Sequence, residues 1–314
     1  MMEKPTVNPQ GYDVAIVGGG MAGLTAAIYC LRFKLTTVAF AKEPGGAINE
    51  SHLVENWPGV QSIKGAQLME RVVKQAEALG AKFIFDEVNA VAAASGAFEV
   101  TTAGGQAARA AAVILATGCE RRKLGVPGEK EYTGRGVSYC ATCDAFFFKG
   151  KTVAVIGGSD SAVGSAELLA EFARKVYIIY RRERLRAEPL RVDRALANPK
   201  IEVVYESWVE SIEGRDTVRA VRLNGERSLA VDGVFVEIGF DPSRKLTEQL
   251  GIELDESGFI RIDEGCHTNV EGVFAAGDVT TGSDKIRQLV TAAAEGAIAA
   301  ENVYKYIKRR PLEL

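Results

Sequence analysis

The stretch "DVAIVGGGMAGLTAAIYCLRF", residues 13–33, decides the fold class. It opens with the apolar run Asp13–Val17, which has strand character, and the segment after "GGGMAG" has helical composition. Gly18, Gly20 and Gly23 match G-x-G-x-x-G between a strand and a helix, the context that this pattern requires. The first glycine permits a tight turn, the second lets the backbone meet a pyrophosphate, and the third lets the helix pack on the strand. The stretch predicts a Rossmann-like nucleotide-binding unit.

The neighbouring segments support this prediction. The N-terminus of the expected helix offers unpaired N–H groups to phosphates. A second apolar run, "TTVAF", leads to Glu43, which is about where an acid would hold a ribose hydroxyl. The alternative is a glycine-rich turn that binds no ligand.

The same pattern recurs in "KTVAVIGGSDSAVGSAELLAEFA", which runs from Lys151 to Ala173. Here Gly157, Ser159 and Ala162 occupy the three positions of a G-x-G-x-x-A motif. Ser159 adds a Cβ atom and a hydroxyl where the backbone would approach phosphate most closely. The repeat predicts a second nucleotide-binding unit with a less open turn.

The strand after this second turn, "KVYIIY", ends in "RRERLR" rather than in an acid. Arg181, Arg182 and Arg186 could neutralise a ribose 2′-phosphate, the group that distinguishes NADP from NAD. The alternative is a solvated basic cluster. A unit for an adenine dinucleotide and a unit for NADP in one chain imply electron transfer between two cofactors.

The C-terminal third contains "GVFAAGDVT", a strand that ends at Gly277 and Asp278, followed by a long Ala-rich helix. Upstream, "AAVILATG" is another buried-type strand and ends at Gly118. If both turns belong to one site, the first domain is split and resumes after the second. We therefore expect an α/β protein with two Rossmann-like domains, the second inserted into the first. The expected boundaries are 1–122, 123–246 and 247–314, at polar segments that contain Gly or Pro.

The stretch "GVSYCATCDAFFF", residues 136–148, contains the only local cysteine pair, Cys140 and Cys143. A structural zinc site needs about four ligands, and the sequence offers no second C-x-x-C and only two histidines. A redox dithiol is therefore the first interpretation, with zinc or two core thiols as the alternatives, and we expect no bound metal. The phenylalanines Phe146–Phe148 are expected in the core.

The composition excludes several functional classes. The chain has 314 residues, of which 47% are hydrophobic and 25% charged, as in soluble globular proteins. A net charge of -3 gives no electrostatic case for binding nucleic acid or an anionic membrane. No apolar segment approaches the length of a membrane span, and "MMEKPTVNPQ" does not look like a secretory signal. We expect a cytoplasmic protein.

Taken together, the motifs "GGGMAG", "ENWPG", "ATG", "CATCD", "GGSDSA", "RRERLR", "AAGD" and "RQ" resemble those of the low-molecular-weight thioredoxin reductases in order and spacing. These are class II members of the pyridine nucleotide–disulfide oxidoreductases. The resemblance extends from about Tyr12 to the last helix. It implies FAD on the split domain, NADPH on the inserted one, a homodimer, and reduction of a thioredoxin-like protein.

The resemblance also assigns roles to residues. Cys140 and Cys143 would form the redox disulfide, and Asp144 would be the nearby general acid. Because Cys143 lies beside Asp144, we expect Cys143 to contact the flavin. The resemblance does not assign which of the two thiols attacks the partner protein. The remaining residues implied at the FAD site are Gly18, Gly20 and Gly23 at the pyrophosphate, Glu43 at the adenosine ribose, Asn56 near the flavin, Asp278 at the ribityl chain, and Arg287 and Gln288 beneath the flavin ring.

The sequence departs from the family pattern mostly in the second nucleotide site. The family usually has glycine where Ser159 stands, two glutamates where Gly164 and Ser165 stand, and histidine where Tyr180 stands. These departures leave a second hypothesis open: a disulfide reductase of the same architecture that takes electrons from NADH, a reduced deazaflavin or ferredoxin. A third hypothesis is a flavin-binding protein without turnover.

Overall fold

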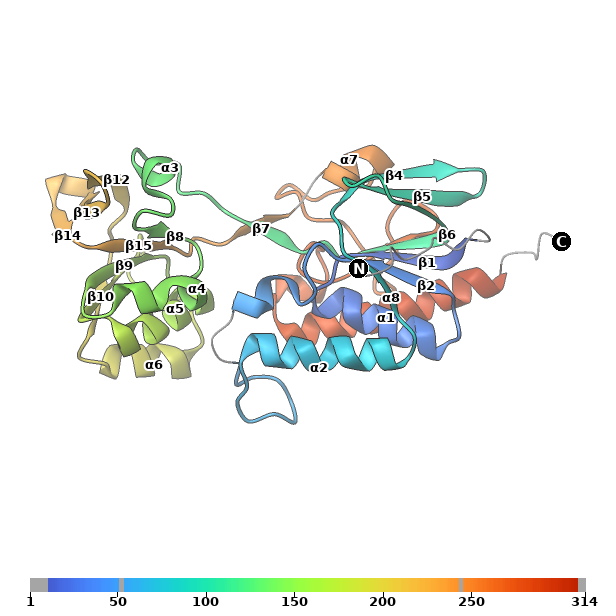
Figure 1. Ribbon diagram of the computed structural model, residues 1–314, viewed down its shortest axis with the longest axis horizontal. Helices are drawn as coiled ribbons and strands as arrows, with labels where there is room; N and C mark the ends of the chain where they lie inside the picture. The colour runs from blue at the N-terminus through green and yellow to red at the C-terminus, as the bar shows by residue number, and fades with distance from the viewer. Residues whose placement is uncertain (1–10, 51–53, 243–244, 310–314) are drawn as a thin grey trace, which may run out of the picture. The chain divides into compact units, whose positions relative to one another are not determined.

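The chain leaves its first compact unit at Glu120, builds a second one over Arg121–Asp241 and returns to the first at Pro242 (Figure 1). This computed structural model describes residues 11–50, 54–242 and 245–309. The first unit also contains the residues up to Asn49 and Val54–Glu120. The predicted insertion of one α/β domain into another is confirmed.

The first unit is built on a seven-stranded sheet in the order β3-β2-β1-β6-β5-β4, with β17 also paired to β6. Strands β1, β2, β3, β6 and β17 are parallel, whereas β4, β5 and β6 pair antiparallel. The strands are β1 (Tyr12–Val17), β2 (Thr37–Phe40), β3 (Lys82–Ile84), β4 (Val88–Ala94), β5 (Ala97–Thr102), β6 (Ala107–Leu115) and β17 (Val273–Ala275).

Three helices pack on one face of this sheet: α1 (Met21–Arg32), α2 (Gly65–Ala78) and α8 (Leu289–Arg309). Successive strand residues point to opposite faces, so Val14 and Ile16 pack with these helices. Ala15 and Val17 pack on the other face, together with residues from β4, β5 and the short helix α7 (Lys245–Leu250). Burial of both faces explains why residues 14–17 of β1 are all apolar.

Helices α1 and α8 cross in close contact. A Cβ atom on Gly296 would lie 2.2 Å from the carbonyl oxygen of Ala22, so only glycine permits this approach. The crossing holds the beginning of α8 next to the turn that precedes α1.

The second unit has a five-stranded parallel sheet in the order β11-β10-β9-β15-β8. Its strands are β8 (Val137–Ser138), β9 (Thr152–Ile156), β10 (Lys175–Ile179), β11 (Ile201–Val204) and β15 (Gly233–Val236). Its helices are α3 (Glu129–Tyr132), α4 (Ala141–Asp144), α5 (Asp160–Phe172) and α6 (Pro189–Ala197), with a 3₁₀ turn η2 (Ala145–Phe148) after α4. An antiparallel sheet of β12 (Val209–Gly214), β13 (Val218–Leu223) and β14 (Ser228–Ala230) completes the unit.

The two linkers between the units pair with each other as β7 (Cys119–Arg121) and β16 (Phe240–Pro242). The backbone N–H of Arg122 donates to the carbonyl oxygen of Gly239 at 2.9 Å. The Arg122 guanidinium also forms an ion pair with Asp241. The chain therefore enters and leaves the second unit along adjacent paths.

No helix within the described ranges combines the length and the apolar character that crossing a bilayer requires.

Candidate functional site

The glycine turn of the first unit has the expected strand-turn-helix geometry. Gly18 has a φ of +125°, and a Cβ atom there would lie 2.0 Å from the carbonyl oxygen of Ala116. A Cβ atom on Gly23 would lie 2.0 Å from the carbonyl oxygen of Gly18. Contacts this short exclude any side chain. Both glycines are therefore required by the protein backbone itself.

Gly20 is different. Its φ of -77° and ψ of -174° suit any residue, and a Cβ atom there would meet nothing within 4 Å. Gly20 is also the N-cap of α1 and supplies no side-chain cap to the first turn of the helix. Open space beside uncapped helix N–H groups is the cradle that a pyrophosphate needs, so this turn fits a dinucleotide such as FAD.

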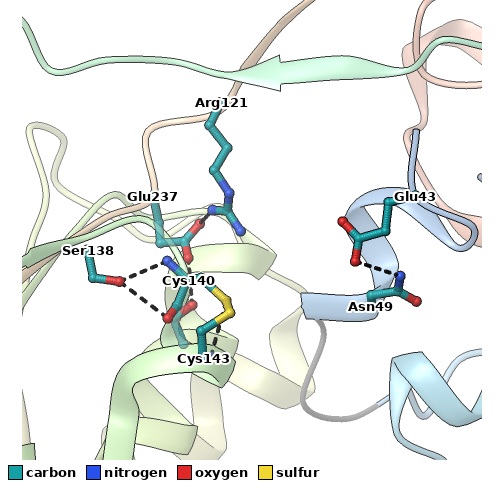
Figure 2. Close-up of a disulfide and its surroundings, with 8 residues drawn as sticks. Glu43, Asn49, Arg121, Ser138, Cys140, Cys143 and Glu237 are labelled. Atoms are coloured by element: carbon teal, nitrogen blue, oxygen red, sulfur yellow. Dashed lines mark hydrogen bonds and ion pairs between the residues drawn. A yellow bond between two sulfur atoms is a disulfide. The ribbon is translucent and has the colours of Figure 1, made fainter. Parts of the chain in front are cut away.

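The acid that follows the second strand lies on a loop fixed to this turn. The N–H of Gly45 donates to the carbonyl oxygen of Gly19 at 2.7 Å, and a Cβ atom on Gly19 would lie 2.5 Å from the Cβ atom of Ala41. Glu43 is exposed on this loop, with Asn49 Nδ2 3.5 Å from its Oε1 atom (Figure 2). The Glu43 carboxylate is therefore close to the turn and accessible to the ribose of a bound dinucleotide.

The turns after β6 and β17 lie at neighbouring strand ends, because these strands pair in parallel. Gly118 has a φ of +62° and open space around its Cα atom, whereas a Cβ atom on Gly277 would lie 2.8 Å from that of Ala22. The Cys119 thiol donates to the carbonyl oxygen of Asp278 at 3.2 Å. The structure therefore brings together the predicted "ATG" and "GD" turns.

A small cavity opens at this point of the first unit. Burial raises the pKa of the Asp278 carboxyl, Arg287 opposes this rise, and Glu295 adds to it. The Arg287 guanidinium lies 4.2 Å from the centre of the Phe259 ring. The cavity is lined by Gly277, Asp278, Thr280, Gly282, Ile286, Arg287, Thr291, Ala292 and Glu295.

Two other predicted residues meet at the start of α8. Asn56 Nδ2 donates to Oε1 of Gln288 at 3.0 Å, although 232 positions separate them in the sequence. The predicted residues of the split domain therefore come together.

The glycine turn of the second unit repeats this geometry with one change. Gly157 has a φ of +142°, and a Cβ atom there would lie 2.0 Å from the carbonyl oxygen of Glu237. Ser159 is the N-cap of α5 and has the same extended backbone as Gly20, with a ψ of -179°. Its hydroxyl makes no cap and has no hydrogen-bond partner among the described residues. The Ser159 side chain therefore occupies the position that is empty beside Gly20 in the first turn.

The basic segment after β10 lies against this turn. The backbone N–H of Arg186 donates to the carbonyl oxygen of Gly158 at 2.6 Å. Arg181, Arg182 and Arg186 have exposed side chains, and none forms an ion pair with a residue in the described ranges. The Tyr180 ring packs on Gly158, and its buried hydroxyl has no hydrogen-bond partner in those ranges. Three guanidinium groups are therefore available to an anionic ligand.

Cys140 and Cys143 form a disulfide, and their Cα atoms are 5.3 Å apart (Figure 2). Ser138 Oγ accepts from the Cys140 N–H at 3.0 Å, and Cys140 Sγ accepts from the Cys143 N–H at 3.1 Å. Cys143 is exposed, Cys140 and Asp144 are half-buried, and α4 carries the pair at its start. The two cysteines are bonded to each other, as the redox-dithiol interpretation predicts.

Two of the other cysteines, Cys30 and Cys266, are buried. Burial raises the pKa of the Cys30 thiol and that of the Cys266 thiol to about 12 each, so both stay protonated at neutral pH. In the ranges that the structure describes, no group of three or more His, Cys, Asp or Glu side chains is placed to hold a metal ion.

Residues 12–296 match the family described as pyridine nucleotide-disulphide oxidoreductase. The chain belongs to this family. A curated thioredoxin reductase from Listeria innocua is 42% identical over 304 residues, which cover 95% of this chain and 94% of that protein. A thioredoxin reductase from Bacillus subtilis is also 42% identical, with 95% of both chains covered. The crystal structure of the Lactococcus lactis thioredoxin reductase has a TM-score of 0.91 at 36% identity, and the match covers 95% of this chain and 100% of that one.

The expectation for the three phenylalanines of this pyridine nucleotide-disulphide oxidoreductase was partly wrong. Phe148 is buried and packs edge-on against Phe235 at 5.2 Å. Phe146 and Phe147 are 67% and 68% exposed, because the 3₁₀ turn η2 directs only its last ring inward. An exposed aromatic pair therefore follows the disulfide by three residues.

Sequence reasoning missed two buried acids of this pyridine nucleotide-disulphide oxidoreductase. Glu237, at the end of β15, accepts from Ser165 Oγ at 2.8 Å and from Arg121 Nη1 at 3.1 Å (Figure 2). Glu295 lies inside α8 and lines the cavity near Asp278. Neither acid belongs to a recognisable motif. A glutamate in an Ala-rich helix normally predicts a solvated face.

Proposed function

We propose that the chain is an NADPH-dependent thioredoxin reductase, which carries electrons from NADPH through FAD to the Cys140–Cys143 disulfide and on to a thioredoxin-like protein. The observation that carries this proposal is the exposed disulfide on a nucleotide-binding unit, in a chain whose other unit has an open dinucleotide turn. We also propose a homodimer, as the family resemblance implies, and a location in the cytoplasm, as the sequence analysis predicts.

The residues of the split unit fit FAD. The open turn at Gly20 would receive its pyrophosphate, Glu43 would accept from the adenosine ribose, and Asp278 would accept from the ribityl chain. Bound FAD would supply the conversion of a two-electron hydride donor into the reduction of a disulfide. The protein contributes binding, orientation and electrostatics.

The residues of the inserted unit fit NADPH. The exposed guanidinium groups beside the second turn would form charge-assisted hydrogen bonds with the ribose 2′-phosphate. Ser159 narrows the space for the pyrophosphate that NADPH and NADH share. The expected result is a preference for NADPH, with weaker affinity than an open turn would give.

The proposed reaction passes two electrons from NADPH to the Cys140–Cys143 disulfide and then to the disulfide of the partner protein. NADPH and one proton reduce the Cys140–Cys143 disulfide to two thiols and leave NADP⁺. One thiolate then attacks the disulfide of the partner protein and forms a mixed disulfide, which the second thiol resolves as the original disulfide forms again. Asp144 follows Cys143 directly and would give a proton to a departing thiolate or take one from a thiol.

Stopped-flow mixing with NADPH tests the proposal: the flavin absorbance should bleach, and added thioredoxin should then gain two thiols. Bleaching by NADH, a reduced deazaflavin or reduced ferredoxin, but not by NADPH, would instead favour the second hypothesis. Bleaching without thiol transfer would favour a flavin protein without turnover.

The exposed aromatic pair supports docking of a protein substrate. Replacing Phe146 and Phe147 with alanine should raise the KM for thioredoxin roughly tenfold, since exposed aromatic side chains contribute strongly to protein interfaces. Reduction of the small disulfide DTNB should stay unchanged. Trp208→Ala removes another exposed aromatic side chain of the same unit and serves as the control. An unchanged KM in the double variant would exclude this docking surface.

The arginines should determine the choice of nicotinamide. Replacing Arg181 and Arg182 with alanine should lower kcat/KM for NADPH by roughly tenfold or more per contact and leave that for NADH nearly constant. Arg184→Ala is the matched control, because Arg184 lies on the same loop next to its ion-pair partner Glu183. Ser159→Gly should lower the KM for both nucleotides. An equal loss with NADPH and NADH in the double variant would contradict recognition of the 2′-phosphate.

A further inference from the structure

Glu295 is a buried acid, and both of its carboxylate oxygens accept hydrogen bonds. Its side chain lies inside α8 and the residue is 5% exposed. Oε2 accepts from the backbone N–H of Gly277 at 2.8 Å and lies 2.9 Å from the hydroxyl of Thr280. Oε1 accepts from the hydroxyl of Ser283 at 2.7 Å.

These contacts tie one loop to the helix at three points. The loop runs from Gly277 to Ser283, and Asp278 lies between the first two points of attachment. The Thr280 hydroxyl also lies 2.9 Å from the carbonyl oxygen of Gly277, which closes the turn around Asp278. The Asp278 carboxyl therefore has little freedom to leave the cavity that it lines.

Glu295 also acts on Asp278 electrostatically. The charged groups that face the Asp278 carboxyl are Arg287, at the entrance to α8, and Glu295 within it. Burial raises the pKa of Asp278, Arg287 lowers it, and Glu295 raises it. The acid that fixes the loop therefore also favours the protonated form of the side chain that the loop carries.

We propose that Glu295 is a positioning residue of the flavin site, which holds the Gly277–Ser283 loop so that Asp278 presents its carboxyl group to the cofactor. The inference deepens the proposed function and rests on it. Glu295 touches no reacting atom in this proposal, and it acts through Asp278.

Reconstitution of the apoprotein with FAD, followed by flavin fluorescence, tests the proposal. Glu295→Gln and Ser283→Ala should each weaken FAD binding roughly tenfold, since the first replaces an accepting oxygen with an amide NH₂ and the second removes a donor to the carboxylate. Glu301→Gln is the matched control, because Glu301 is a half-buried acid on the same helix and pairs with Lys305 at 3.4 Å rather than with the Gly277–Ser283 loop. Two variants keep the test valid if one of them fails to fold.

The pH dependence of FAD affinity separates positioning from a purely structural role. An ionised Asp278 accepts a hydrogen bond from a cofactor hydroxyl more strongly, so affinity should fall as the pH drops through the pKa of Asp278. Glu295 raises that pKa, so Glu295→Gln should move the midpoint to lower pH, and Asp278→Asn should abolish it. A purely structural loss would weaken binding equally at every pH.

FAD binding by the wild-type protein distinguishes failure of the proposed function from failure of this inference. Wild-type protein that binds no FAD would overturn the proposed function and, with it, this inference. Wild-type protein that binds FAD, with unchanged affinity and an unchanged midpoint in Glu295→Gln and Ser283→Ala, would overturn the inference alone.

Discussion

Replacing Cys143 with serine is expected to abolish NADPH-driven reduction of thioredoxin and to leave FAD fully bound. A serine hydroxyl forms no disulfide and is no acceptor for two electrons, so the path from flavin to partner ends there. The substitution is nearly isosteric, and Cys143 is exposed, so the fold should keep its thermal stability. Activity with thioredoxin, flavin content and thermal unfolding are the three measurements.

Cys119→Ser is the control for this result. Cys119 is half-buried, and its thiol donates to the backbone carbonyl oxygen of Asp278 within the first unit. A serine hydroxyl can donate to the same oxygen, so activity should change little. Full activity in Cys143→Ser, or equal loss in Cys119→Ser, would contradict the assignment of the redox pair.

Replacing Gly20 with valine is expected to lower the affinity for FAD by at least about 100-fold and to leave the apoprotein folded. The backbone at Gly20 suits any residue, and the added side chain would enter open space in the apoprotein. Loss of a good N-cap residue should cost only about 1 kcal/mol of unfolding free energy. The same side chain would occupy the space that a pyrophosphate needs.

Gly23→Ala is the complementary variant, because it is expected to destabilise the fold rather than to block the cofactor. A Cβ atom there would lie 2.0 Å from the carbonyl oxygen of Gly18, so this smaller substitution should lower the thermal stability of the apoprotein far more than Gly20→Val. Gly20→Ser should be intermediate in FAD affinity, since Ser159 occupies the equivalent position in the second unit. Normal FAD binding by Gly20→Val would show that the dinucleotide does not lie on this turn.

The parts of the site that are local in sequence could be predicted. Gly18 has a positive φ in the turn, and a Cβ atom on Gly23 would meet the carbonyl oxygen of Gly18 within the same strand-turn-helix segment, so the need for glycine at both positions follows from the local motif. Cys140 and Cys143 are three residues apart, so a short helical turn is enough to bring their sulfur atoms together. The repeated motif then predicted two domains of the same type, and the structure has them.

The parts that depend on distant contacts could not be predicted. Glu295 resembles an ordinary solvent-facing residue of α8, and only the return of the Gly277–Ser283 loop buries it. Glu237 likewise has hydrogen-bond partners that are distant in sequence, Arg121 and Ser165, which lie 116 and 72 positions away. The exposure of Phe146 and Phe147 depends on the direction of one 3₁₀ turn, which apolar composition does not determine.

The pairing of the two linkers makes the inserted unit a transferable cassette. Its first and last residues lie on adjacent strands, β7 and β16, and no strand of either main sheet crosses this boundary. A gene segment for Arg121–Asp241 could thus be removed and the gap closed by a short turn, while the seven-stranded sheet keeps its order. The same arrangement would let recombination exchange the donor site and the disulfide together as one unit, without disturbing the sheet of the first unit.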